Sequence, residues 1–320
     1  MTNDIENHYH YNALDTPPEE GKIKIQGGIR YNRKIFLTTI TTPRGKKRKM
    51  ATPYWITSII KWLYPLRDHF ARITRWPLVA PILDRLFFDG DHMVYLPKDR
   101  VIIQQSVNAG ENIVLPSSVL HHFIDHTQAL FIMDKCLCRV SADCQNHPHD
   151  LGCIFLGSAA LKINPRLGRP VSREEAHAHV RRCQEAGLVH MIGRDRLDPL
   201  WMGVFPARQL LTICNCCKCC CLFNILPHIE PSLSARISRM PGVKVEVDAE
   251  TCSGCGRCLQ DVCFANAISL ENGSAYINAE CRGCGRCVEI CPQQAIALTI
   301  EDDDFIENTI ARIEPLVDLN

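Results

Sequence analysis

Eight cysteines near the C-terminus form two repeated runs. Each run has three cysteines spaced C-x2-C-x2-C, and a fourth cysteine follows after three or four intervening residues. The first set is Cys252, Cys255, Cys258 and Cys263, and the second set is Cys281, Cys284, Cys287 and Cys291. The residues between the cysteines match as well, CSGCGRC in the first run and CRGCGRC in the second. The two runs are therefore an internal repeat with a period of about 29 residues.

This spacing suits the ligation of iron–sulfur clusters. Three thiolates from one tight loop can bind three corners of a cubane, and the fourth thiolate comes from the other half of the repeat. We expect one [4Fe–4S] cluster on Cys252, Cys255, Cys258 and Cys291, and a second on Cys281, Cys284, Cys287 and Cys263. Paired C-x2-C motifs can also bind zinc, but triple-cysteine loops with remote partners fit tetrahedral zinc sites poorly.

Residues 243–300 resemble the bacterial-type two-cluster ferredoxin domain. Besides the cysteines, the resemblance includes the glycines that let each loop curl around a cluster: Gly254, Gly256, Gly283 and Gly285. It implies a pseudo-symmetric α+β fold over 241–300 and one-electron transfer. The first half departs from the family pattern at two positions. Four residues rather than three precede Cys263, and Phe264 replaces the usual proline. They leave the ligands intact and could shift the potential of that cluster.

Eleven further cysteines precede this domain, all between Cys136 and Cys221. Four lie in residues 136–153, and six lie within the eight residues 214–221. Vicinal thiols oxidise readily, so we expect metal binding here, with at least one further iron–sulfur cluster. The expected ligands are Cys136, Cys138, Cys144, Cys153, Cys214, Cys216, Cys217, Cys219 and Cys220.

Two arrangements of these upstream cysteines remain open. Either each segment makes its own cluster, or both converge on one larger or non-cubane cluster. His147 and His149 are alternative ligands or proton donors, and we expect Cys183 to be a buried apolar thiol. The stretch from Cys136 to Cys221 resembles the N-terminal part of bacterial iron–sulfur proteins with a C-terminal ferredoxin domain. That type of protein has no assigned activity, so this resemblance implies metal binding and no more specific function.

The amino-acid composition limits the classes of protein to which the chain can belong. The 320 residues are 46% hydrophobic and 22% charged, with a formal net charge of +1, which excludes a disordered or globally basic chain. The cysteine count of 19 is odd, and the N-terminus MTNDIENHYH has no apolar signal region. We therefore expect a soluble, cytoplasmic protein rather than a secreted disulfide scaffold.

The charge is unevenly distributed. Residues 21–75 contain 14 Lys or Arg and one acid, whereas the last 20 residues carry a net charge of −6. Residues 54–76 have helical apolar spacing with interspersed basic residues, and Pro65 should interrupt the helix. Such a segment can lie on a membrane surface, so we consider membrane contact through 44–76. The alternative for residues 54–76 is ordinary packing against the core. For the wider basic segment, a solvated face is the simplest interpretation, and binding to nucleic acid is disfavoured.

The fold class that we expect is α+β. A helix-rich N-terminal and central domain with a cysteine-rich metal site should precede a ferredoxin-like two-cluster domain. The expected elements are a strand in 29–42, a helix over 117–133, a helix between the capping box at Ser172 and the C′ residue Gly187, and a strand over 188–192. The expected organisation is a disordered basic segment 1–50, a helix-rich cysteine-containing domain 51–235, the ferredoxin domain 241–300 and an acidic tail 301–320.

Three functions fit these patterns. The first is an electron carrier of anaerobic type that passes single electrons through the ferredoxin clusters and an upstream cluster to redox partner proteins. The second is a redox enzyme whose upstream cysteine site is the catalytic centre. The third is a redox or iron sensor whose basic segment contacts nucleic acid. No nucleotide-binding signature occurs, so we expect neither flavin nor NAD in this chain.

Overall fold

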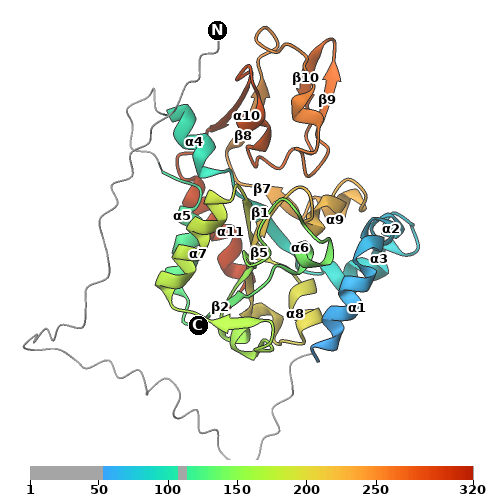
Figure 1. Ribbon diagram of the computed structural model, residues 1–320, viewed down its shortest axis with the longest axis vertical. Helices are drawn as coiled ribbons and strands as arrows, with labels where there is room; N and C mark the ends of the chain where they lie inside the picture. The colour runs from blue at the N-terminus through green and yellow to red at the C-terminus, as the bar shows by residue number, and fades with distance from the viewer. Residues whose placement is uncertain (1–52, 107–113, 320) are drawn as a thin grey trace, which may run out of the picture. The chain divides into compact units, whose positions relative to one another are not determined.

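The computed structural model describes residues 53–106 and 114–319, all within one compact unit that spans residues 49–320 (Figure 1). The expected disorder in 1–50, the strand in 29–42 and most of the basic segment lie outside the described residues. Helices and mixed sheets occur together, so the α+β class is confirmed.

A seven-stranded sheet lies at the centre, in the order β4-β2-β3-β6-β5-β1-β7. All neighbours in this sheet are antiparallel except β1 and β7, which are parallel. The strands are β1 (His92–Tyr95), β2 (Leu130–Met133), β3 (Ile154–Leu156), β4 (Gly168–Pro170), β5 (Val189–Arg194), β6 (Leu211–Cys216) and β7 (Ile237–Arg239). Of these seven strands, only β5 was predicted from the sequence, and the sheet to which it belongs was not.

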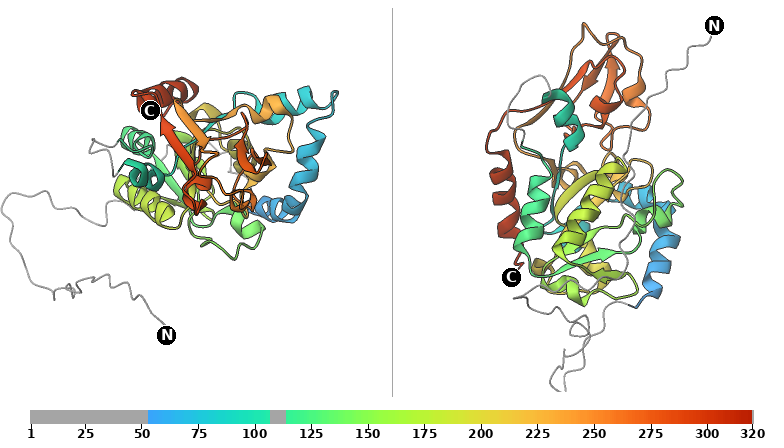
Figure 2. Two further views of the ribbon diagram at one scale, coloured as in Figure 1. Left: turned by 90° about the horizontal axis from the view of Figure 1, so that it is seen from above. Right: turned by 60° about the vertical axis from the view of Figure 1, so that its left-hand side comes forward.

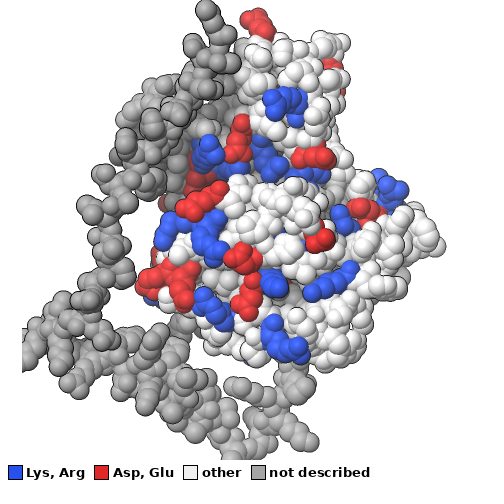
Figure 3. Space-filling model, in the orientation of Figure 1, with Lys and Arg blue, Asp and Glu red and all other residues white. Residues whose placement is uncertain are grey.

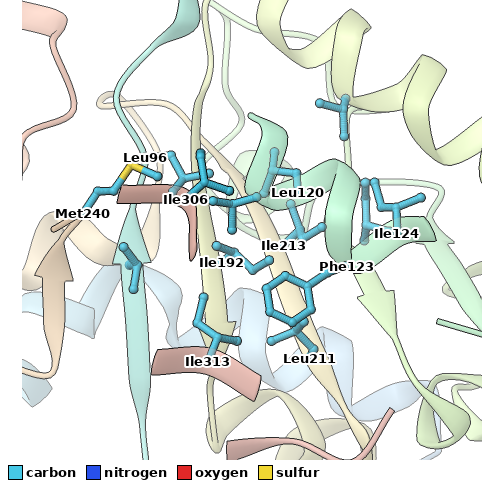
Figure 4. Packing of buried hydrophobic residues seen from close by; sticks show 14 of the residues in the cluster. Leu96, Leu120, Phe123, Ile124, Ile192, Leu211, Ile213, Met240, Ile306 and Ile313 are labelled. Atoms are coloured by element: carbon cyan, nitrogen blue, oxygen red, sulfur yellow. The ribbon is translucent and has the colours of Figure 1, made fainter. Parts of the chain in front are cut away.

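The two faces of this sheet bury different sets of side chains. Helices α5 (Ser118–His126), α7 (Arg173–Glu185) and α11 (Phe305–Ile313) cover one face (Figures 1 and 2). Their apolar residues pack on the sheet in one core, part of which Figure 4 shows. Because side chains alternate along a strand, Ile213 of β6 points into this core, whereas Cys214 and Cys216 belong to a core on the opposite face.

Two predicted helices have different outcomes. The helix α7 forms as expected, since the Ser172 hydroxyl accepts a hydrogen bond from the Glu175 N–H and the glycine at 187 adopts φ +72°. The helix expected over 117–133 ends at His126. Residues 130–133 instead form β2, so the prediction was wrong there. All four side chains of β2 are buried. A continuous apolar run shows neither the alternation of a half-buried strand nor the 3.6-residue period of a helix, so the sequence alone does not distinguish them.

The N-terminal described segment is helical. Helix α1 (Trp55–Leu63) and helix α2 (Arg67–Ile73) are separated by a short 3-10 turn at Tyr64–Leu66, which confirms the interruption at Pro65. Helix α3 (Ala80–Leu83) follows. The remaining short helices are α4 (Asp99–Ser106), α6 (Leu137–Ser141), α8 (Leu197–Met202) and α9 (Pro231–Ser234). Within the part of the chain that is described, no helix is long and apolar enough to cross a membrane.

The C-terminal lobe contains two antiparallel strand pairs. Strand β8 (Val243–Val247) pairs with β11 (Ile296–Ile300), and β9 (Ile268–Glu271) pairs with β10 (Ser274–Ile277). The short helix α10 (Arg286–Ile290) lies between them in sequence. The segment expected as an acidic tail contains α11, whose Ile306 and Ile313 are buried in the main core. Its acidic residues therefore flank a packed helix.

Candidate metal centres

The structure gathers the first C-terminal set of four as expected. Cys252, Cys255, Cys258 and Cys291 line one cavity, so the fourth cysteine does come from the other half of the repeat. Burial raises the pKa of Cys258, and the nearby Cys252, Cys291 and Cys255 raise it further. Thiols that are brought this close retain their protons unless a cation compensates their charge, which is what a cluster would do.

The second set gathers in the same crossed manner. Burial raises the pKa of Cys284 to about 12, and the neighbouring Cys263 and Cys281 also raise it. Cys287 has a raised pKa for the same reasons, with Cys284, Cys281 and Cys263 as its neighbours. Cys263, from the first half of the repeat, therefore lies with the three cysteines of the second half.

The backbone around both sets suits iron–sulfur clusters. Gly254 and Gly283 have φ of +65° and +66°, a region that residues with a Cβ rarely adopt. The curled backbone directs N–H groups at the sulfurs: the Gly283 N–H donates to the Cys281 sulfur at 3.4 Å, and the Ala275 N–H donates to the Cys252 sulfur at 3.4 Å. These donors stabilise thiolate charge, and the Ala275 N–H lowers the pKa of Cys252. The residues present thus fit two clusters, although the ligand assignment stays a prediction.

Seven upstream cysteines line a cavity of about 340 Å³, which we call the inner cysteine site. They are Cys136, Cys138, Cys153, Cys214, Cys216, Cys217 and Cys221. The sulfurs of Cys216 and Cys221 are 3.0 Å apart, and those of Cys153 and Cys214 are 3.9 Å apart. Hydrogen bonds from Cys136 and Cys221 lower the pKa of Cys138 well below its usual range. Seven thiols exceed the four that one cubane binds, so the site fits a larger cluster or a cubane with spare thiols.

Four upstream cysteines form a second group, which we call the outer cysteine site, and one of them, Cys217, also lines the inner cavity. The sulfurs of Cys144, Cys217, Cys219 and Cys220 all lie within 4.8 Å of one another. Cys219 is exposed, and the other three are buried. Burial opposes ionisation of Cys144, but hydrogen bonds from Cys220 and from the N–H groups of Asn146 and His147 lower its pKa.

This division matches neither arrangement expected from the sequence. Segments 136–153 and 214–221 do converge, but they form two sites, and each site takes cysteines from both segments. Cys221 was missing from the expected ligands, although its place in the run of six was the available signal. Cys183 is fully buried, as predicted. Neither His147 nor His149 belongs to the group of four among the described residues, and the His149 ring nitrogen lies 3.0 Å from the Cys144 carbonyl oxygen.

Apolar side chains and two carboxyl groups also line this cavity. They include Phe155, Trp201 and Leu200 together with Asp195 and Asp198. Burial raises the pKa of Asp198 to about 6, and burial together with Asp198 raises the pKa of Asp195 well above its usual range. This environment favours the protonated form of the Asp195 carboxyl.

Arg139 is a fully buried cation between the two upstream sites. Its guanidinium donates to the Asn215 carbonyl oxygen at 3.0 Å and to the Leu151 carbonyl oxygen, and it lies 3.9 Å from the Cys217 sulfur. Burial alone would lower the pKa of Arg139, but the neighbouring Cys136 and Cys217 raise it above its usual value. The guanidinium thus remains charged and offsets thiolate charge on both sides.

An aromatic pair connects the inner site to the C-terminal lobe. Tyr95 of β1 and Phe264 are both buried, with ring centroids 5.4 Å apart. They share one apolar core with Cys214, Cys216 and Cys221, and Cys284 packs against this core. Burial raises the pKa of Tyr95, as do Cys216, Cys221 and Cys284, so this ring lies near thiols of both sites.

The family model of the LdpA Fe-S cluster-binding domain matches residues 259–301, a small part of the chain. The matched residues include Cys263 and the whole second cysteine run. The chain carries an iron–sulfur domain near its C-terminus. No curated protein and no solved structure matches the chain.

We predict that Arg139→Gln loses upstream metal while the C-terminal lobe keeps its iron. Removal of the cation leaves the thiolates of two sites uncompensated, and loss of one partner from a buried pair costs about 3–5 kcal/mol. Iron, zinc and sulfide per chain, with urea unfolding under anaerobic conditions, would measure both effects.

The matched control is Arg169→Gln, since Arg169 forms an exposed ion pair with Glu175 at 2.8 Å. This variant should change the unfolding free energy by less than about 1 kcal/mol and leave all metal in place. Equal metal content in the Arg139 variant and the wild type would contradict the role assigned to the buried cation.

Proposed function

We propose that this protein is an electron-transfer protein with three iron–sulfur centres. Two ferredoxin-type [4Fe–4S] clusters would be held by the eight C-terminal cysteines. They would relay single electrons between redox partner proteins and a third cluster at the inner cysteine site. Because clusters and vicinal thiolates are sensitive to oxygen, we propose an anaerobic, cytoplasmic setting.

The observation that carries this proposal is the continuous buried core between the two metal regions. Cys284, Tyr95 and the inner cysteines Cys216 and Cys221 all contact this core, without an intervening solvent layer. Phe264 extends the same core into the C-terminal lobe and follows Cys263 directly in sequence. In this proposal, the aromatic ring that replaces the family proline would lie between neighbouring centres.

The first experiment is an iron and acid-labile sulfide count on anaerobically purified full-length protein, with EPR of the reduced form. Two cubane clusters contribute about eight irons per chain, so twelve or more support a further cluster. We expect the inner variant Cys153→Ser to lose only the iron above eight. About eight irons in the wild type, with only two interacting cluster signals, would contradict an upstream cluster.

The aromatic connection gives a second test of the relay. In Phe264→Leu, electron transfer from the C-terminal clusters to the upstream centre should slow several-fold, because a smaller side chain loosens the contact. Rapid-freeze EPR after partial reduction would follow each centre. Leu259→Ala, at a position 40% exposed in the same lobe, is the control and should transfer at the wild-type rate. An unchanged rate in Phe264→Leu would exclude this route.

A second candidate function is a redox enzyme, and the cavity at the inner site favours it. Its volume of about 340 Å³ lies in the range of small-molecule sites, and most of the residues that line it besides the cysteines are apolar. We propose that a small, mainly apolar substrate would bind beside the inner cysteines. Two electrons from the ferredoxin clusters and two protons, one of them from Asp195, would reduce it.

Carbon monoxide is a suitable probe for this second candidate. We expect a C–O stretching band in the infrared spectrum of the reduced wild-type protein if an iron faces the cavity. Leu200 lines the cavity and is 43% exposed, so Leu200→Trp should narrow the entrance and weaken the band. Leu259→Trp, away from the cavity, should keep it. A wild-type protein without a carbon monoxide band favours the carrier alone.

We also propose that α1 and α2 bind an anionic membrane surface. Their solvent-facing side is an apolar stripe with helical spacing, Trp55, Ile59, Trp62, Leu66 and Phe70, in which Trp62 is 75% exposed. Exposed Arg72 and Arg85 lie nearby in sequence, and the right-hand side of Figure 3, where these helices lie, is largely uncharged. An exposed apolar stripe with basic neighbours is typical of helices at anionic lipid interfaces.

We predict that Trp55→Ser/Trp62→Ser abolishes co-sedimentation with vesicles of phosphatidylcholine and phosphatidylglycerol. The wild-type protein should bind these vesicles, and binding should weaken with salt because part of the attraction is electrostatic. The control is Leu161→Ser, since Leu161 is 60% exposed elsewhere on the surface. Equal binding by the double variant, or none by the wild type, would contradict membrane contact through this stripe.

A further inference from the structure

The outer cysteine site differs from the other cysteine groups in the spacing of its sulfurs. Its four sulfurs lie within 4.8 Å of one another, and those of Cys144 and Cys219 are 3.6 Å apart. Among the described cysteines, no other group of three or more meets this spacing. Four thiolates around one tetrahedral ion, with metal–sulfur bonds of about 2.3 Å, lie ~3.8 Å from one another. A cubane holds its thiolates farther apart, because each binds a different iron.

We propose that the outer cysteine site binds a single Zn²⁺ ion and not an iron–sulfur cluster. All four ligands would be thiolates from the protein, which closes the coordination sphere and makes the site structural. A tetrahedral set of four sulfurs suits zinc or iron, and affinity for a given site rises from Fe²⁺ to Zn²⁺. The Arg139 guanidinium, 3.9 Å from the Cys217 sulfur, favours the thiolate form that the ion needs.

The position of this ion would explain why the inner cysteines are held in place. Three of its ligands lie between Cys216 and Cys221, which both face the inner site. Hydrogen bonds also hold this short segment. The Tyr64 hydroxyl donates to the Cys220 carbonyl oxygen at 2.5 Å, the Cys221 N–H donates to the Cys217 carbonyl oxygen at 3.1 Å, and the Asn224 amide donates to the Lys218 carbonyl oxygen. An ion shared with Cys144 would tie the segment to the 136–153 loop, which supplies three more inner cysteines.

The test is a metal count on the full-length protein, purified anaerobically with both zinc and iron supplied. We expect one zinc per chain in the wild type and loss of most of it in Cys219→Ser, whose exposed side chain can change without disturbing the core. Iron and sulfide of the C-terminal lobe should stay unchanged. Cys183→Ala is the control, since this buried thiol packs beside Cys144 and Cys217 without belonging to the group of four.

A spectroscopic measurement keeps the proposal testable if zinc exchanges during purification. Protein loaded with Co²⁺ should show the visible bands of tetrahedral cobalt thiolate, and Cys219→Ser should lose them. Wild-type protein without zinc and without these bands would overturn the proposal. Loss of iron and sulfide in place of zinc would assign a cluster, and one iron without sulfide would overturn the choice of zinc. The C-terminal iron count is independent, so these outcomes leave the proposed ferredoxin clusters to their own test.

Discussion

Compensation of thiolate charge is the constraint on which the rest of this structure depends. Ten cysteines lie in two adjacent groups beside one sheet, and most are buried. Buried thiolates repel one another and lose hydration, so such a packing is stable only if the thiols stay protonated or cations offset their charge. Arg139 is the cation that this chain supplies between the groups, and bound metal would supply the rest. Folding of this region would then be coupled to metal binding.

The sheet provides the division into two sites. Cys214 and Cys216 occupy alternate positions on β6, so both point away from the helix-covered face. The strand ends at Cys216, and the chain then turns. Cys217 contacts both sites, Cys219 and Cys220 belong to the outer group, and Cys221 returns to the inner one. The run thus serves two sites, and its density results from two geometries in one short segment.

The C-terminal repeat was predictable because its information is local. Spacing and glycine positions alone indicated crossed sets of four, and the structure brings those cysteines together. The capping box at Ser172 and the interruption at Pro65 are local in the same sense. The central sheet was not predictable, since strands such as β2 are short, uniformly apolar and buried on both faces. The division of the upstream cysteines depends on where β6 ends, and the sequence of the run does not mark that point.

The spacing of the sulfurs explains why the inner site, and not the outer one, has space for a reaction. An outer set whose sulfurs already approach tetrahedral contact leaves no space between its ligands. The inner cysteines instead line a cavity together with residues of α8 and its neighbours, among them Asp195 and Asp198. The outer group is closed, and the inner group is larger and lined with carboxyl groups. This arrangement is expected if the outer site fixes a loop and the inner site transfers electrons or binds a substrate. The aromatic contact of Tyr95 with Phe264 joins only the second of these to the iron–sulfur lobe.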